Sequence, residues 1–169
     1  TVRFDDSDVY SLDRKGLSAF RRRAQVIFQD PYQSLNPKDC AFQIVSEPLR
    51  VHHLASGAEL LERCVKALEA AGLRPAGSFL DRSPHELSGG QRQRLAITAS
   101  LVLDPAFIVA DEMVSMLDLS VRAGIVRLLS SLRDERGLSF LFITHDLALA
   151  WLIADRIAIM YLGRVVETG

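Results

Sequence analysis

Residues 87–94 read Leu-Ser-Gly-Gly-Gln-Arg-Gln-Arg. Ser88 and Gln91 fit a capping box, in which the serine oxygen and the glutamine side chain satisfy backbone groups at the start of a helix. The two glycines between them, Gly89 and Gly90, allow the backbone to approach a ligand closely. A helix start also carries partial positive charge, which favours an anion. This stretch therefore predicts a helix whose N-terminus binds phosphate.

A second stretch, Phe107-Ile108-Val109-Ala110-Asp111-Glu112, joins an apolar run to two carboxylates. The run predicts a buried parallel strand, and ligands of open α/β sheets lie at the carboxyl ends of such strands. Neighbouring residues on a strand point to opposite faces, so we expect Asp111 and Glu112 to diverge. An isolated Asp-Glu pair is more often two solvated acids than a site, but here it follows a phosphate-binding stretch, which favours a site.

Apolar periodicity and turn residues predict alternating strands and helices around these two stretches. Strands are expected at 24–28, 106–112, 139–144, 156–161 and 164–167, and helices at 12–23, 58–71, 88–102, 120–136 and 146–154. Ser120 is the expected N-cap of the long helix, and Gly137 and Gly72 are expected to end helices. Such alternation predicts an α/β protein with a parallel sheet, into which the helical middle is inserted.

The composition excludes several classes of function. A net charge of −1 gives no support to nucleic-acid binding, which favours a strongly basic domain. No apolar run approaches the roughly 20 residues that a membrane span needs. Cys40 and Cys64 lack the CxxC spacing of a zinc site, and Cys64 is expected to pack as a small apolar residue. The expected compartment is the cytosol.

In this order, the two stretches resemble the signature and Walker B motifs of the ABC (ATP-binding cassette) ATPases. Three further strings look like that family's Q-loop, D-loop and H-loop: Val26-Ile27-Phe28-Gln29-Asp30-Pro31, Ser115-Met116-Leu117-Asp118 and Ile143-Thr144-His145-Asp146. The resemblance implies a P-loop NTPase-type parallel sheet with a helical insertion. It also implies that the ligands are ATP and Mg²⁺.

The resemblance assigns roles to individual residues. Asp111 and Gln29 belong to the Mg²⁺ shell, Glu112 is the general base toward water, and His145 hydrogen-bonds the γ-phosphate. A lone Gln after a strand is usually solvated, and a lone His is more often structural, so Gln29 and His145 depend on their surrounding strings. Residues of the signature and D-loop would reach a nucleotide bound mainly by a second subunit: Ser88, Gly89, Gly90, Gln91 and Asp118.

Longer strings resemble one branch of the family, the oligopeptide/dipeptide/nickel importer ATPases of bacteria and archaea. These strings are 28–37, Glu47-Pro48-Leu49, 153–158 and 160–164. The branch implies a second ATPase subunit, identical or different, and membrane permease subunits contacted through 29–80. It implies a peripheral location on the cytoplasmic face of a prokaryotic cell membrane, with no direct contact to the transported solute.

Three residues depart from the family pattern. Met113 stands where proline is usual, Met116 replaces a usual alanine, and Ala99 stands where many members have arginine. None of them removes a catalytic group, so we interpret them as variation within the branch. Loss of hydrolysis through repacking of the D-loop stays open as an alternative.

The family's phosphate loop, G-x-x-x-x-G-K-[ST], does not occur in the 169 residues. We therefore expect a partial domain: a remnant of the ATP-binding core at 1–40, a helical subdomain at 41–103, and further core at 104–169. An open slot is expected between the strands at 139–144 and 156–161. Two rival functions are a soluble ABC ATPase that acts in DNA repair or translation, and a degenerate, non-hydrolytic partner subunit.

Overall fold

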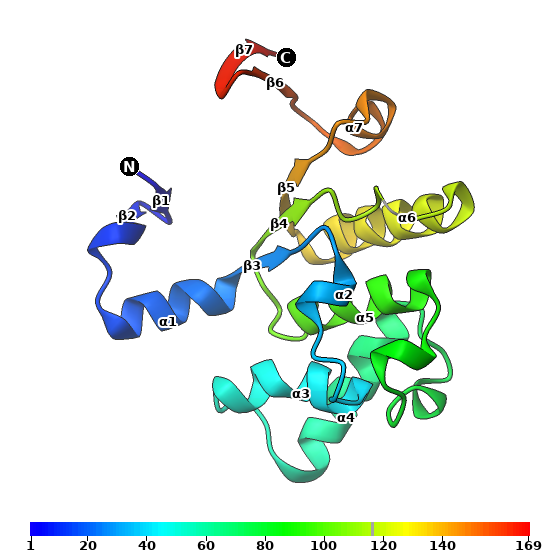
Figure 1. Ribbon diagram of the computed structural model, residues 1–169. Helices are drawn as coiled ribbons and strands as arrows, with labels where there is room; N and C mark the ends of the chain where they lie inside the picture. The colour runs from blue at the N-terminus through cyan, green and yellow to red at the C-terminus, as the bar shows by residue number, and fades with distance from the viewer. Residues whose placement is uncertain (116) are drawn as a thin grey trace.

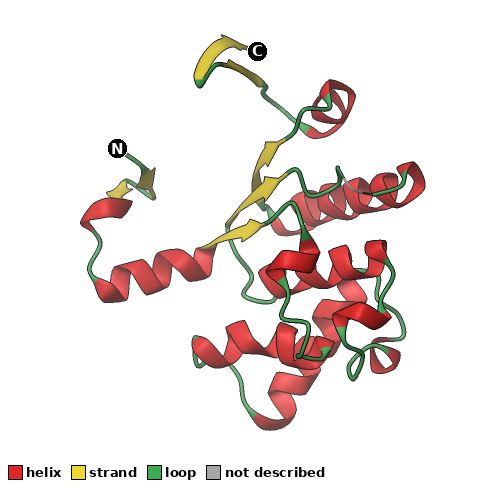
Figure 2. Cartoon of the chain, viewed as in Figure 1, coloured by secondary structure: helices red, strands yellow, loops and turns green. Residues whose placement is uncertain are grey.

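The computed structural model describes residues 1–115 and 117–169, so the departure predicted at Met116 lies outside the described residues. The helices, drawn in Figures 1 and 2, are α1 (Arg14–Arg23), α2 (Pro31–Ser34), α3 (Ala41–Val51), α4 (Gly57–Ala70), α5 (Gly89–Leu101), α6 (Leu119–Arg136) and α7 (Leu147–Ile153), with 3₁₀ turns η1 (Val9–Ser11), η2 (Ala76–Ser78) and η3 (Pro84–Glu86). The strands are β1 (Arg3–Phe4), β2 (Ser7–Asp8), β3 (Ala24–Ile27), β4 (Phe107–Asp111), β5 (Ser139–Ile143), β6 (Ala158–Tyr161) and β7 (Arg164–Thr168).

A parallel sheet of three strands in the order β3-β4-β5 confirms the predicted α/β class. Val109 of the central strand pairs with Val26 of β3 on one side and with Leu141 of β5 on the other. Parallel strands need crossover connections, and here α6 connects β4 to β5 while the helical segment α2–α5 connects β3 to β4. All three strands therefore end at the same edge of the sheet.

Strand β6 does not extend this sheet within the described residues. It pairs with β7 in an antiparallel hairpin, which Figure 1 shows beyond α7, far from the helical segment. The first two strands form a second short hairpin, β1–β2.

Two hydrophobic cores lie on either side of helix α5. Leu95 and Ala96 pack with α3 and α4, whereas Ile97 and Leu101 pack with the sheet and α6. Helix α5 is consequently buried on nearly all faces and couples the helical segment to the sheet. Cys64 lies in the first core, fully buried, and burial raises the pKa of its thiol to about 11.

Most helix ends match their sequence signals. Ser88 and Gln91 form the predicted capping box at α5, and Gly137 ends α6 with a φ of 63°. Gly72, with a φ of 79°, follows the last residue of the α4 cap, Ala71, where left-handed glycine commonly ends a helix. The prediction of Ser120 as N-cap was wrong: α6 begins at Leu119, because the backbone of the preceding residue already accepts the first helical hydrogen bond.

Across the described residues, no helix is both long enough and apolar enough to cross a membrane.

Candidate functional site

Three polar side chains meet at the carboxyl edge of the parallel sheet. Gln29 follows β3, Glu112 follows β4, and His145 follows β5. Gln29 Nε2 donates a hydrogen bond to Glu112 Oε2 over 2.9 Å, and His145 Nδ1 lies 3.1 Å from Glu112 Oε1. Each carboxylate oxygen of Glu112 therefore has one partner, and each partner comes from a different neighbouring strand. The sequence predicted all three residues for one site, and the fold brings them together.

The backbone of Glu112 has left the strand. Its φ of 42° lies in the left-handed region, which a glutamate adopts at a cost of about 1–3 kcal/mol. Its N–H donates to Ile143 O, and its own carbonyl accepts from both N and Oγ of Ser115. Because Glu112 is off the strand, alternation along β4 does not set the direction of its side chain, so opposite faces for Asp111 and Glu112 do not follow from strand geometry. Strained backbone of this kind gathers at functional sites.

Asp111 is the last residue of β4, and its side chain is half-buried beside this cluster. The Nε2 group of Gln29 is used by Glu112, which leaves the Gln29 carbonyl oxygen as an acceptor. A carboxylate and an amide oxygen suit Mg²⁺, which takes few protein ligands and completes its shell with waters and phosphate oxygens. No group of three acidic, His or Cys side chains suited to a metal occurs among the described residues. The donor set fits a Mg²⁺ ion that is shared with a phosphate.

The turn at Ser88 lies elsewhere. Ser88 Oγ accepts from Gln91 N at 3.3 Å, and Gln91 Oε1 accepts from Ser88 N at 3.0 Å. Among the described contacts, none joins this turn to Gln29, Glu112 or His145. The predicted site residues therefore fall into two groups within one chain.

Gly90 has a packing role that the sequence did not reveal. A Cβ at this position would lie 2.6 Å from Cγ1 of Val121, at the start of α6, whereas a Cβ at Gly89 would come no closer than 3.9 Å to Leu117. Of these two glycines, Gly90 is the one that the close approach of α5 and α6 requires. Asp118, predicted to cross a dimer interface, is exposed between these two contact points and makes no side-chain cap bond.

Arg92 holds the segment that precedes the signature turn (residues 88–91). Its buried guanidinium donates from Nε to Pro84 O at 2.8 Å and from Nη2 to Leu87 O at 2.9 Å. Burial lowers the pKa of Arg92, and the nearby negative charge of Asp30 opposes that shift. Asp30, which follows Gln29, therefore interacts electrostatically with Arg92 of helix α5. The role of Arg92 could not be predicted from the sequence, because an arginine within a polar string gives no sign of burial.

Two of the three departures from the family pattern, Met113 and Ala99, lie in packed positions. Met113 is 1% exposed and belongs to the core beneath the sheet. Ala99 is partly buried against the core of the helical segment. Neither of these residues contacts the cluster around Glu112 through a described hydrogen bond or ion pair.

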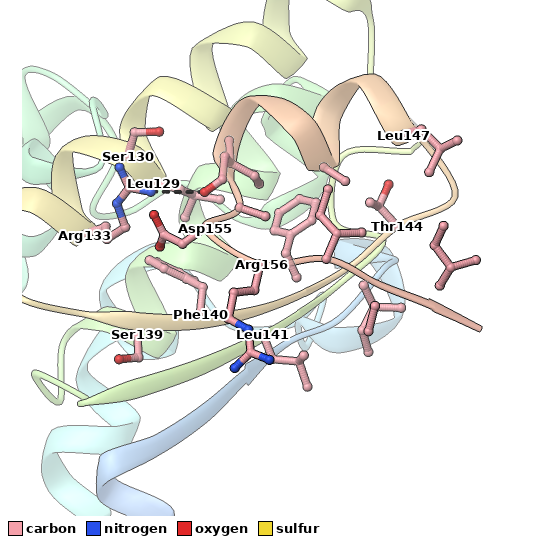
Figure 3. Close-up of a pocket in the computed structure, with 18 of the residues that line it drawn as sticks. Leu129, Ser130, Arg133, Ser139, Phe140, Leu141, Thr144, Leu147, Asp155 and Arg156 are labelled. Carbon is pink, nitrogen blue, oxygen red and sulfur yellow. Dashed lines mark hydrogen bonds between the residues drawn. The ribbon is translucent and has the colours of Figure 1, made fainter. Parts of the chain in front are cut away.

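A groove of about 1000 Å³ runs along the edge of β5 that does not pair with β4. Figure 3 shows Phe140 and Leu141 of β5, Arg133 of α6 and Asp155 around it, and its remaining walls come from α7 and β6. Leu141 is 50% exposed, although parallel strands are usually covered on both faces. The slot expected beside the strand at 139–144 is therefore present as an apolar hollow, and β6 forms a wall of it without pairing to β5.

These features define an α/β domain with a parallel sheet, an inserted helical segment and a polar cluster at the strands' carboxyl ends. Residues 1–115 match the family described as ABC transporter, and the chain belongs to that family. YkfD of Bacillus subtilis, whose name proposes an oligopeptide transport ATP-binding protein, is 48% identical over 99% of this chain. The glutathione import ATP-binding protein GsiA of Salmonella paratyphi A is 47% identical over 98% of it. The chain spans 50% of the first protein and 26% of the second.

Solved structures agree with this assignment. The ATP-binding cassette MJ0796, in a post-hydrolysis dimer with ADP and Pi, superposes with a TM-score of 0.84 at 31% identity, covering 98% of this chain and 71% of that one. The cbiO1 protein of Clostridium perfringens, part of the ABC transporter complex cbiONQ, gives a TM-score of 0.85 at 30% identity, covering 99% and 64%. The fold predicted from sequence is thus confirmed as that of an ABC ATPase cassette.

Proposed function

We propose that this chain is part of an ATP-binding and ATP-hydrolysing subunit that energises an ABC importer for peptides or similar small solutes. The observation that carries the proposal is the pair of contacts that hold the Glu112 carboxylate between Gln29 and His145. Relatives named for oligopeptide, peptide and glutathione import support the solute class. A peripheral position on the cytoplasmic face of a prokaryotic membrane follows from that role.

Glu112 is the proposed general base. A carboxylate whose oxygens are fixed by two neighbours can accept a proton from a water that attacks the γ-phosphate, which needs a base in hydrogen-bond reach. An ionised carboxylate only accepts hydrogen bonds, so a proton on Nδ1 of His145 would be donated to Glu112, and a proton on Nε2 would instead be available to a phosphate oxygen. Asp111 and the carbonyl oxygen of Gln29 would hold Mg²⁺, which neutralises charge on the transferred phosphoryl group.

The signature turn is proposed to act on a second copy of the site. Ser88, Gly89, Gly90 and Gln91 lie apart from the Glu112 cluster in one chain, which supports their use by a nucleotide on a partner subunit. A pair of subunits related by a two-fold axis brings each turn to the other's cluster. Asp118, exposed beside the turn, is proposed to lie at that interface. Whether the partner is identical or different is independent of this geometry.

The proposed division into subdomains is supported by the two cores. Residues 41–103 supply nearly all of the first core, while 104–169 supply most of the second, together with Ile27, Ile97 and Leu101. We assign 1–40 and 104–169 to the ATP-binding core, and 41–103 to the helical subdomain that meets the permease.

The decisive experiment is Glu112→Gln in the full-length protein, assembled with its permease in vesicles. Removing a positioned base lowers turnover by about 10²–10⁴-fold while leaving nucleotide binding intact, so ATP-dependent dimerisation should persist. Glu135→Gln, an exposed acid on α6, is the matched control and should hydrolyse ATP normally. A Glu112→Gln protein that retains more than about a third of wild-type turnover would refute the assignment.

The same assay separates the rival functions. A non-hydrolytic partner subunit would show no turnover in the wild type when paired with itself. A soluble ATPase outside transport would hydrolyse ATP with no response to the permease or to solute. Stimulation of turnover by the permease supports the importer.

A further inference from the structure

We propose that Arg122 is a positioning residue that fixes His145 and Glu112 relative to each other. Arg122 lies in the first turn of α6, between the segments that follow β4 and β5. Its Nη1 donates to Asp146 Oδ2 over 3.1 Å, and its Nη2 approaches Ser115 O at 3.5 Å. One guanidinium therefore spans the two segments that carry the members of the cluster. The catalytic part of this inference rests on the proposed function.

On the His145 side, the contact reaches the turn that holds the imidazole. Asp146 Oδ1 caps α7 by accepting from Leu149 N at 3.1 Å, and Asp146 N donates to Thr144 Oγ1 at 3.0 Å. The residues on both sides of His145 are thus hydrogen-bonded in place. His145 itself is 72% exposed, and Glu112 is its one described side-chain partner. The direction of its ring therefore depends on the backbone that Asp146 fixes.

On the Glu112 side, the contact reaches the turn that supports the left-handed backbone. Ser115 donates to Glu112 O from its N–H at 3.0 Å and from its hydroxyl at 2.9 Å. The Ser115 carbonyl, which points back to Arg122, belongs to the same turn. Arg122 therefore contacts the residue that closes the Glu112 turn and the residue that closes the His145 turn.

The ion pair with Asp146 is partly shielded from water. The Arg122 and Asp146 side chains are 28% and 33% exposed, so solvent screens this pair less than a surface pair. The Nε of Arg122 is buried and has no partner among the described residues. An arginine that leaves a donor unsatisfied is held by its other contacts, since such a group costs free energy. Those other contacts are the two that span the cluster.

A second arginine on the same helix supplies a matched control. Arg133 donates from Nη1 to Ile153 O over 3.0 Å and so contacts the C-terminal end of α7. Arg122 contacts the N-terminal cap of the same helix. Both are bonds from an α6 guanidinium to α7 or its cap. Only Arg122 also lies beside the turns that carry Glu112 and His145.

The test compares Arg122→Gln, Asp146→Asn, their double variant and Arg133→Gln in the full-length protein. Asn caps helices as well as Asp, so Asp146→Asn keeps the cap of α7 and removes the charge that Arg122 meets. Small displacements of catalytic groups are costly, by about 10²-fold per ångström. We expect kcat to fall at least tenfold in Arg122→Gln and Asp146→Asn, with KM for ATP unchanged within about threefold. The double variant should be no slower than either single one, since both remove the same contact.

Arg133→Gln should lower the melting temperature about as much as Arg122→Gln does, while its kcat stays within about twofold of wild type. Equal kcat losses in Arg133→Gln and Arg122→Gln would show a merely structural effect and overturn the proposal. Additive losses in the double variant, or an unchanged kcat in Arg122→Gln, would overturn it as well.

Hydrogen exchange in the same proteins distinguishes this inference from the proposed function. Arg122→Gln should speed amide exchange in both 112–115 and 144–149, whereas Arg133→Gln should speed exchange only near 150–156. This result is expected even if the wild-type protein hydrolyses no ATP, in which case the proposed function fails and the coupling stands. Faster exchange confined to 144–149 would refute the coupling to Glu112.

Discussion

Gly90 lies where the start of α5 passes closest to α6. A methyl group there would sit 2.6 Å from Val121 Cγ1, a separation that real Cβ contacts do not show. Gly90→Ala should therefore destabilise the full-length protein by about 1–3 kcal/mol through overpacking, even though alanine favours a helix. Chemical denaturation followed by circular dichroism measures this change.

Gly89 provides the comparison at the same helix start. An alanine there would meet Leu117 at 3.9 Å, an ordinary contact, so Gly89→Ala should leave the free energy of unfolding unchanged or slightly higher. Combining Gly90→Ala with Val121→Ala should recover much of the stability lost by Gly90→Ala alone. If both glycine variants unfold at the same denaturant concentration, packing against Val121 does not explain Gly90.

These glycines show what a single residue's sequence context can predict. The capping box of Ser88 and Gln91 was predicted because its partners are three residues apart and the geometry is local. The role of Gly90 and the pairing of Arg122 with Asp146 were not predictable, because each partner lies on another element of the sheet or helices. The sequence therefore identified the capped helix start, whereas the contact of Gly90 with Val121 became visible only in the folded structure.

Among the elements, α3 and α4 form the surface that we expect to meet the proposed permease. They pack together on α5, whose other side covers the sheet that carries Gln29. Val51 and Leu61 are 64% and 45% exposed on these helices. Single cysteines at these positions in the full-length protein should crosslink to permease subunits in vesicles, and a cysteine at the exposed Ser131 of α6 should not. Crosslinks confined to 120–169 would contradict the assignment of 29–80 as the permease contact.

The accuracy of the sequence predictions varied with the range of the interactions that set each element. The strands β3, β4 and β5 and their order of appearance followed from apolar runs and their polar ends. Helix α6 begins before the predicted cap Ser120, because the carbonyl of Asp118 already accepts a helical hydrogen bond from Arg122 N. A favourable cap residue alone does not fix where a helix starts. Strand β6 pairs with the neighbouring β7 in a local hairpin, whereas its place relative to β5 is set by contacts between distant segments, which no local pattern encodes.

At the scale of the whole molecule, the chain exposes an unusual amount of surface. Its accessible area is 10553 Å², whereas a compact monomer of 18.8 kDa is expected to expose about 8,300 Å². Much of the excess comes from the C-terminal part, where no residue from Ala150 to Gly169 is buried, and from the groove along β5 (Figures 1 and 3). The polar cluster around Glu112 lies at the end of this incompletely covered sheet.

The 169-residue polypeptide alone is expected to bind nucleotide weakly. Binding of ATP depends on donors for its phosphates, and a phosphate loop supplies them through backbone N–H groups and a lysine. The cluster seen here offers two carboxylates, which repel phosphate unless Mg²⁺ lies between them, and the signature turn lies apart from it. We therefore expect a Kd for Mg-ATP weaker than about 1 mM, equivalent to under about 4 kcal/mol of binding free energy.

Isothermal titration calorimetry of this polypeptide with Mg-ATP, beside the full-length protein, measures the difference. A longer chain that carries the family's phosphate loop should bind at least tenfold more tightly, because that loop supplies phosphate donors, whereas the residues described here would contribute the proposed base and metal ligands. Micromolar binding by the 169 residues would mean that another of their segments rebuilds the phosphate site. The groove beside β5 would then be the place to look for it, since it opens toward Thr144 and His145 at the same edge as Glu112.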